Sequence, residues 1–457
     1  MKVIKIGGGC LKGAETIEQI LELIGERGIG HIFVLSALNG ITNHLIDGMQ
    51  QALEREENIP RLVQHIRKQH LSVARHLIPS EESFKQFSHE FNASLKQLER
   101  LYYGLNFTRE ITPRLWDGIS SFGEQFSVEL LTYALRYRGI DAIYRMPQEI
   151  GMISDGKFGD ATANLTKCAK RFQESVVPLL SAERILLLPG FFGVNEGGEI
   201  TTFGRGGSDY SAAVVAAALQ AESLEIWKDV AGFMSTDPKF VPGAQLIPLL
   251  SYEEAAELAY FGAQILHPRT MEPVRKHQIP IEIKNTLNPD APGTLITAKS
   301  PKTQAVIKSV AYNTAIGVIK IHAPGVGARP GILGRIADRL AEDGLNIKSV
   351  ITSQTCISLL LDARDLDAGY QALKSIKPRP YQGIETLDNV AMLGIVGEGL
   401  LHHKGVAAKC FTAVAEYGVN VEMISFGPSK AALYFLVRQQ DLHDAVLAIH
   451  HSFFPQS

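Results

Sequence analysis

The last third of the chain contains an internal repeat, and this repeat limits the possible folds more than any other feature. A shift of 74 residues superposes matching positions of the two copies: Gly331 on Gly405, Ala341 on Ala415, Glu342 on Glu416, Gly344 on Gly418 and Asn346 on Asn420. Self-similarity at a fixed shift indicates that one structural unit occurs twice. Each copy has the pattern of a strand, a helix, two strands and a helix, with apolar residues at four-residue steps on the first helix. We therefore predict two small βαββαβ-type units that pack together.

The chain before the repeat has the alternation of strands and helices that is typical of an α/β fold. The segment VIKI is followed by glycines, by an expected helix from about Ala14 to Glu26 and by a second buried strand, HIFVLSALNG. Further helices are expected from about Met49 to Leu105 and from Phe122 to Tyr137. The segment NPDAPGTLITAKSPKTQ, rich in Pro, Thr and Lys, marks a domain boundary near residue 300. We predict a mainly parallel sheet sandwiched by helices in residues 1–300, followed by the repeat units at 301–384 and 385–457, whose strands can interleave.

Length and composition are those of a globular protein with two or three domains. The chain has 457 residues, a formal net charge of -3 and no long basic block, so nucleic-acid binding is not expected. We see no apolar run long enough for a signal peptide or a membrane span. The four cysteines are scattered without a CxxC spacing, which is typical of reduced thiols, and we expect a cytoplasmic protein. The histidines show no metal-ligand spacing, and no Ser/His/Asp triad can be proposed.

A run of three glycines follows the first expected strand and precedes the first expected helix. The N–H groups of Gly7, Gly8 and Gly9 could approach phosphate oxygens closely, and the N-terminus of the helix would favour an anion. Lys5 lies two residues before the run and could add its ammonium group. The motif is neither GxxxxGK[ST] nor a complete GxGxxG, so a tight turn beside a solvated lysine explains it equally well.

A second glycine-rich loop, residues 204–209, carries a guanidinium, a hydroxyl and a carboxylate at the start of an apolar helix. The guanidinium of Arg205 has the fork geometry that suits a substrate carboxylate. Ser208 or Asp209 could instead cap the helix. Capping explains one residue and leaves the flanking Gly/Arg pattern unexplained, so we favour an anion site in this loop.

Two other loops follow strands and carry polar side chains. One contains Ser36, Thr42 and Asn43, and the other contains Lys228, Asp229, Thr236 and Asp237. In an open α/β sheet, ligands collect beyond the carboxyl ends of the strands. Each loop alone is compatible with ordinary turn chemistry. Four polar or glycine-rich loops together predict one cleft that handles phosphate groups.

Six motifs occur in the order found in aspartate kinases: KIGGG, VLSALNGITN, FGEQFS, TTFGRGGSD, WKDVAGFMSTDP and FGAQILHP. The C-terminal repeat resembles the paired ACT domains of those enzymes, so the resemblance covers nearly the whole chain. On these residues the chain resembles the aspartate kinases of the amino-acid-kinase fold. The resemblance implies phosphoryl transfer from ATP, with Mg²⁺ as cofactor, to the side-chain carboxylate of L-aspartate. The implied product is 4-phospho-L-aspartate, an intermediate of lysine, threonine and methionine biosynthesis.

The resemblance also implies the role of each site residue. Lys5 and Asp209 would be catalytic, with Asp209 ordering the site. The ammonium group of L-aspartate would contact Glu124, and its α-carboxylate would contact Arg205. The other implied contacts of L-aspartate come from the same two loops that hold Arg205 and Ser36: Ser36, Thr42, Gly206, Gly207 and Ser208. ATP would contact Lys5, Ile6, Gly7, Gly8, Gly9, Lys228, Asp229, Met234, Lys239, Gln264 and Ile265. No side chain is expected to bind a metal directly.

Several residues depart from the family's pattern. Gln264 stands where a lysine that contacts the transferring phosphate is usual, and this removes a cation from the transition-state region. Lys5 with Mg²⁺ could suffice, a neighbouring lysine such as Lys228 could substitute, or catalysis is weakened. The usual KFGG(T/S) start is KIGGG-Cys10 here, and Met234 replaces a loop aromatic near the nucleotide.

The repeat units depart from the pattern as well. In the second unit PSKAALYF replaces the usual serine, acidic and asparagine residues, and in the first Lys348 stands where an acidic residue is common. The resemblance implies an amino-acid effector at the ACT units and a homodimer or homotetramer, but inhibition by lysine or threonine does not follow from these residues. Two alternatives stay open. One is another amino-acid kinase of this fold with a different substrate, and the other is a catalytically weak regulatory protein that contains ACT units.

Overall fold

The computed structural model describes residues 1–180, 184–263, 265–298, 306–326 and 329–454. The chain forms two compact units. Unit 1 comprises Met1–Phe233, Leu246–Ala256 and Gln264–Ser300, and unit 2 comprises Met234–Gln245, Glu257–Ala263 and Pro301–Ser457. Two short segments that precede the expected boundary near residue 300 therefore belong to unit 2.

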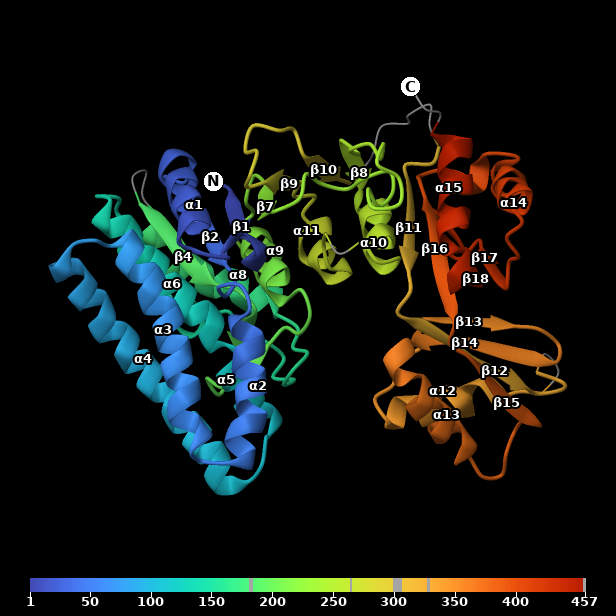
Figure 1. The fold of residues 1–457 in the computed structure, drawn as a ribbon, viewed down its shortest axis with the longest axis horizontal. Coiled ribbons are helices and arrows are strands. Elements are labelled where there is room, and N and C mark those ends of the chain that lie inside the picture. Colours follow the sequence, from blue (N-terminus) through green and yellow to red (C-terminus); the bar gives the residue numbers. More distant parts are fainter. Residues whose placement is uncertain (181–183, 264, 299–305, 327–328, 455–457) are drawn as a thin grey trace. The chain divides into compact units, whose positions relative to one another are not determined.

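Unit 1 is built on an eight-stranded sheet in the order β3-β4-β2-β1-β7-β9-β10-β8 (Figure 1). Its strands are β1 (Val3–Ile6), β2 (Ile32–Leu35), β3 (Ala142–Tyr144), β4 (Ile185–Pro189), β7 (Leu224–Lys228), β8 (Leu249–Ser251), β9 (Ile281–Asn285) and β10 (Thr294–Thr297). All neighbouring pairs are parallel except β9 and β10. The sequence prediction of a mainly parallel sheet is confirmed. A separate antiparallel hairpin joins β5 (Phe192–Val194) to β6 (Ile200–Thr202).

Helices cover both faces of this sheet. Side chains alternate between the faces of a strand, and the apolar residues Ile4 and Ile6 pack into the core with α1 (Ala14–Arg27) and α6 (Phe122–Tyr137). Lys5 points the opposite way, toward α9 (Gly207–Ala218). The remaining helices that lie wholly in unit 1 are α2 (Ile41–Glu54), α3 (Asn58–Leu77), α4 (Glu81–Thr108), α5 (Pro113–Ser120), α7 (Pro147–Ile150), α8 (Leu165–Ser175) and α11 (Met271–Arg275). The expected helix-rich stretch after Met49 corresponds to the last part of α2, followed by the whole of α3 and α4. All three helices pack beside α6 (Figure 1).

Unit 2 contains two four-stranded antiparallel sheets, one for each copy of the repeat. The first sheet has the order β13-β14-β12-β15, with β12 (Ile316–His322), β13 (Ser349–Thr352), β14 (Cys356–Asp362), β15 (Gly383–Leu387), α12 (Ile332–Glu342) and α13 (Leu366–Lys374). The second has the order β11-β16-β18-β17, with β11 (Ser309–Asn313), β16 (Val390–Val396), β17 (Met423–Phe426), β18 (Ala432–Arg438), α14 (Val406–Glu416) and α15 (Leu442–Phe453). Strand β11 precedes the first sheet in sequence but pairs into the second, so the strands interleave. The limits at 384 and 385 stay predictions.

Each sheet of unit 2 has its own apolar core. The face of α12 predicted to be apolar is buried at Ile332, Ile336 and Leu340. In α14, Cys410 and Val414 are buried. The helix α10 (Tyr252–Tyr260) begins in unit 1 and ends in unit 2. Among the described residues, we find no helix that combines the length and the apolar character needed to cross a membrane.

Candidate active site

The glycine run forms a tight turn at the carboxyl end of β1. The N–H of Gly7 donates to the carbonyl of Trp227 on the neighbouring strand β7, at 2.9 Å. A single 3-10 turn spans Gly8–Cys10, and helix α1 begins only at Ala14. The expected start of the helix at about Ala14 is confirmed, and three residues after Cys10 separate the turn from α1.

These glycines are closely packed against the neighbouring loops. A Cβ atom on Gly8 would lie 3.1 Å from the carbonyl oxygen of Ala37, and one on Gly9 would lie 3.1 Å from the carboxylate of Asp229. A Cβ atom on Gly7 would lie 3.2 Å from the carbonyl of Trp227. The turn is therefore pressed between the loops that follow β2 and β7, as the carboxyl ends of neighbouring parallel strands require.

Two lysines meet one buried aspartate beside this turn. Lys5 Nζ lies 2.5 Å from Asp209 Oδ1, and Lys228 Nζ lies 3.2 Å from Asp209 Oδ2. Burial alone would raise the pKa of Asp209, but the two ammonium groups outweigh it and hold the pKa below its usual range. Burial, together with the charge of Lys5, lowers the pKa of Lys228. The arrangement concentrates two cations at the end of β1 and β7, with one carboxylate to orient them.

A carboxylate without a full set of partners lies nearby. Glu124, in the first turn of α6, is 4% exposed, and its Oε1 accepts a hydrogen bond from Ser208 at 3.3 Å. Its Oε2 is buried and has no hydrogen-bond partner among the described residues. Burial raises the pKa of Glu124 to about 7. Hydrogen bonding from the backbone of Ala37 and of Glu124 itself, the hydroxyl of Ser208 and the charge of Lys5 only partly oppose this shift. An unpartnered buried carboxylate oxygen needs a cationic or proton-donating ligand.

The loops after β2 approach the same helix. Ser36 is buried at the end of β2, and Thr42 lies in the first turn of α2. A Cβ atom on Gly123 would lie 2.7 Å from Cβ of Ala37 and 3.5 Å from Oγ1 of Thr42. The glycine before Glu124 therefore lets the β2 loop and α2 come close to the start of α6. The structure thus brings together Ser36, Thr42 and Glu124, which are the predicted substrate-binding residues that precede β3 in the sequence.

The loop at 204–209 leads into α9 without a side-chain cap. Gly206 is the N-cap residue with φ of 68°, and no side chain there accepts a capping hydrogen bond. Ser208 instead donates to Glu124, and Asp209 binds the two lysines. The capping explanation for these two residues is therefore wrong. A Cβ atom on Gly206 would also lie 2.3 Å from Cβ of His267, so both backbone and packing require glycine.

Arg205 projects from this loop into solvent. It is exposed, and we find no hydrogen bond or ion pair to its guanidinium within the described part of the chain. An arginine left without a protein partner at the mouth of a polar site is available for a carboxylate ligand. Asp229, by contrast, is engaged by Lys12, a basic residue that sequence reasoning did not single out, at 2.8 Å. Lys12 follows the glycine turn and adds a third cation near it.

The other predicted ATP-binding residues are divided between the two units. The side chain of Ile6 is fully buried in the core, so only its backbone is available to a ligand. Met234 and Lys239 belong to unit 2. Ile265 is partly buried in unit 1. Gln264 lies outside the described residues. The roles of these residues stay predictions.

Two residues that support the site were not found from the sequence. Asp117 is fully buried and accepts hydrogen bonds from Gly159 N–H and from both the N–H and the hydroxyl of Thr202, at 2.7–2.8 Å. Arg269 donates to the carbonyls of Phe203 and Ala161. Both tie down the backbone that leads into the 204–209 loop. In the sequence each is an ordinary charged residue, in RLWDGIS and in HPRTMEP, and no local pattern marks it.

A protein-built metal site is not evident. Within the described ranges, no three His, Cys, Asp or Glu side chains are grouped in a way that could hold a metal ion. All four cysteines are free.

Comparison with known proteins places these features in a family. Residues 1–285 match the model of the amino acid kinase family, and residues 393–453 match a model of the ACT domain. Similar curated proteins include chloroplastic aspartokinase 1 of Arabidopsis thaliana, which is 31% identical over 99% of this chain and 80% of its own length. A bifunctional aspartokinase/homoserine dehydrogenase of Haemophilus influenzae is 27% identical, and the chain spans 56% of its length.

Solved structures show the same architecture. Aspartokinase III of E. coli in complex with aspartate and ADP, in its R-state, superposes with a TM-score of 0.85 at 26% identity and covers 99% of this chain and 100% of that one. The same enzyme in complex with lysine and aspartate, in its T-state, gives a TM-score of 0.82 at 27% identity, with 99% of both chains covered.

Proposed function

The chain belongs to the aspartokinases of the amino acid kinase family, and from this premise we propose that it transfers the γ-phosphoryl group of Mg·ATP to the side-chain carboxylate of L-aspartate. The product would be 4-phospho-L-aspartate. The observation that carries the proposal is the buried, unpartnered Oε2 of Glu124, which lies in the site that also contains the 204–209 loop and the Lys5–Asp209–Lys228 cluster.

Glu124 and Arg205 account for the recognition of an α-amino acid. The ammonium group of aspartate would supply the missing partner of Glu124 Oε2 and so relieve the cost of its burial. The exposed guanidinium of Arg205 would take the α-carboxylate, and Ser36, Thr42, Gly206, Gly207 and Ser208 would line the remaining surface. With the ammonium group bound by Glu124 and the α-carboxylate bound by Arg205, the side-chain carboxylate of aspartate would be free to face the phosphates.

The lysine cluster accounts for phosphoryl transfer. A carboxylate needs no strong base to attack phosphorus, so positioning and neutralisation of charge are the main requirements. Lys5 and Lys228 would meet the phosphate oxygens, with the N–H groups of Gly8 and Gly9 beside them. Asp209 orders both ammonium groups before the nucleotide binds, so little reorganisation is needed in the transition state. Asp229, Met234, Lys239, Gln264 and Ile265 stay our proposed contacts for the rest of the nucleotide.

Hydroxylamine trapping tests the reaction. An acyl phosphate formed from aspartate reacts with hydroxylamine to give aspartyl hydroxamate, which is detected by its iron complex. We expect hydroxamate with aspartate, ATP and Mg²⁺ present together, and none when any of the three is omitted. Glutamate and N-acetylglutamate serve as competing acceptors. Product from one of these, but not from aspartate, would contradict the substrate while leaving the family assignment intact.

Regulation through the ACT units is the second part of the proposal. Aspartokinase III of E. coli has been solved with lysine, and we propose that an amino acid also binds the ACT units of this chain. Lys348 forms an ion pair with Asp362 at 3.2 Å and lies over the ring of Tyr260. An internal ammonium group that already has a carboxylate partner disfavours a second cation, so we expect an effector other than lysine. A cytoplasmic location stays a prediction.

A further inference from the structure

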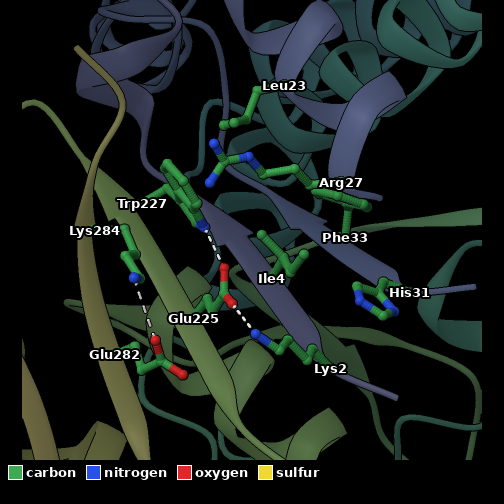
Figure 2. Close-up of a pocket in the computed structure, with 10 residues that line it drawn as sticks. All are labelled: Lys2, Ile4, Leu23, Arg27, His31, Phe33, Glu225, Trp227, Glu282 and Lys284. Atoms are coloured by element: carbon green, nitrogen blue, oxygen red, sulfur yellow. Dashed lines mark hydrogen bonds and ion pairs between the residues drawn. The ribbon is translucent and has the colours of Figure 1, made fainter. Parts of the chain in front are cut away.

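A charged hollow lies on the face of the large sheet opposite to the lysine cluster (Figure 2). Because side chains alternate along a strand, Lys5 and Lys228 point to the α9 face, and their neighbours Ile4 and Trp227 point to the α1 face. Ten residues line the hollow: Lys2, Ile4, Leu23, Arg27, His31, Phe33, Glu225, Trp227, Glu282 and Lys284. Its volume is about 180 Å³.

The charge on this face is not explained by packing. Parallel sheets that are covered on both faces usually carry apolar residues on both. On the α9 face, β7 and β9 follow this rule, with four fully buried residues: Leu224, Ile226, Ile281 and Ile283. On the α1 face the same strands carry Glu225, Glu282 and Lys284, and the register sets Glu225 directly beside Glu282. Two adjacent carboxylates on inner strands cost free energy unless cations meet them.

Glu225 acts as an anchor for Lys2. It is 6% exposed, and both of its oxygens are occupied. Lys2 Nζ lies 2.6 Å from Oε1, and Trp227 Nε1 donates to Oε2 at 2.8 Å (Figure 2). A carboxylate with both oxygens engaged does not attract a cationic ligand, but it holds the ammonium group of Lys2 at the wall of the hollow.

Both carboxylates that line the hollow already have a cation. Lys2 pairs with Glu225, and Lys284 Nζ lies 3.4 Å from Glu282 Oε2 (Figure 2), so Arg27 is the cation of the lining whose partner lies outside it. Lys2, Arg27 and Lys284 bring three fixed positive charges, and Glu225 and Glu282 bring two negative ones. Arg27 pairs with Asp290 at 2.7 Å, but the carboxylate side chain is 86% exposed, and such surface pairs are weak. The guanidinium of Arg27 can therefore exchange Asp290 for a ligand.

We propose that this hollow binds a small dianion, either inorganic phosphate or a short dicarboxylate, through Arg27, Lys2 and Lys284. Arg27 would supply its planar fork of N–H donors, and the lysines would supply compact charges on either side. The hollow has room for several groups of the size of a water molecule, at roughly 30 Å³ each, which suits a ligand of this class. The proposal is independent of the aspartate kinase reaction.

Trp227 provides a direct readout of occupancy. The chain has two tryptophans, so the Trp116→Phe variant leaves Trp227 as the sole emitter, in the wall of the hollow. We expect inorganic phosphate or succinate to change its emission saturably at millimolar concentration, with sodium chloride of equal ionic strength as the blank. Arg27→Gln in the same background should weaken the response at least tenfold. Arg275→Gln is the matched control, since Arg275 is a similarly exposed arginine paired with one carboxylate, Glu253.

A second control separates anion binding in the hollow from anion binding at the glycine turn. The turn is joined to Trp227, because Gly7 N–H donates to the carbonyl of Trp227, so an anion bound there could also change the emission. A response that persists in Lys5→Met and is lost in Arg27→Gln supports the hollow. The reverse pattern, equal responses in the Arg27 and Arg275 variants, or no saturable response, overturns the proposal. Lys284→Gln serves as a second variant if circular dichroism shows that Arg27→Gln is misfolded. The phosphate and succinate titrations decide which of the two anions is preferred.

Discussion

At the scale of single residues, Glu124 predicts how aspartate use depends on pH. Its pKa is raised to about 7 by burial, and an ammonium group binds the ionised carboxylate. The KM for aspartate should therefore rise as the pH falls from about 8 to about 6, while the KM for ATP stays constant. Steady-state kinetics over this range measure both. Glu124→Gln, which stays neutral, should show a high aspartate KM with no such dependence. Parallel changes in the two KM values would contradict this role.

Arg205 predicts a separate effect on the same substrate. Removal of a charge-assisted contact to a carboxylate costs about 1.5–3 kcal/mol, which is roughly a tenfold to hundredfold change in affinity. Arg205→Ala should raise the aspartate KM by that factor and leave ATP affinity, measured by calorimetry, unchanged. Arg205→Lys should recover part of the loss, because the charge is kept without the fork. An equal loss of ATP affinity would assign Arg205 to the nucleotide.

Lys228 tests where the second phosphate-facing cation lies. Its ammonium group shares Asp209 with Lys5, and we propose that it does the work that the resemblance to aspartate kinases implies for a lysine at position 264. Lys228→Met should lower kcat by about 100-fold with ATP still bound. Gln264→Lys should then change little. If Gln264→Lys raises kcat and Lys228→Met is silent, the missing cation was needed at 264. If both variants are silent, the assignment of these two positions to the phosphates is wrong.

At the scale of elements, the start of α9 depends on one glycine. Gly206 has a positive φ and packs against His267. An alanine there would cost about 1–2 kcal/mol in backbone strain and add a steric clash. Gly206→Ala should lower the thermal midpoint and raise the aspartate KM, because Ser208 and Asp209 follow directly. Gly104→Ala is the matched control in the same unit, since a Cβ atom in that helix meets no atom within 4 Å. The control should be neutral or slightly stabilising.

At the scale of the whole molecule, the edges of the ACT-like sheets predict self-association. β13 and β17 are edge strands, and they expose Val350, Ile424 and Phe426. Such edges attract further chains unless they are covered. Light scattering at micromolar concentration should therefore give a dimer or tetramer of the 50.0 kDa chain. Ile424→Lys should shift the population toward monomer. A monomer for the unaltered chain, with and without added amino acids, would refute the prediction.

The amino-acid sequence by itself determined the features that depend on near neighbours. The period of the apolar residues places α1 and α6 within a residue of the expected limits, and the 74-residue shift predicts two units of one pattern, because each helix and strand buries a face that the sequence already marks. The glycines at 204–207 mark a loop with unusual backbone angles. The resemblance to aspartate kinases then supplied the roles of the site residues.

Only the tertiary structure decided which distant residues meet. Lys5 and Lys228 flank the same aspartate because β1 pairs with β7 across more than 200 residues, and no local pattern encodes that pairing. The burial of Glu124, which shifts its pKa, depends on the first turn of α6 meeting the β2 loop and Ser208 in the first turn of α9. Asp117 and Arg269 support the 204–209 loop through backbone groups far along the chain. The distances and burial that set charge and affinity depend on packing between segments, and packing is a property of the folded chain as a whole.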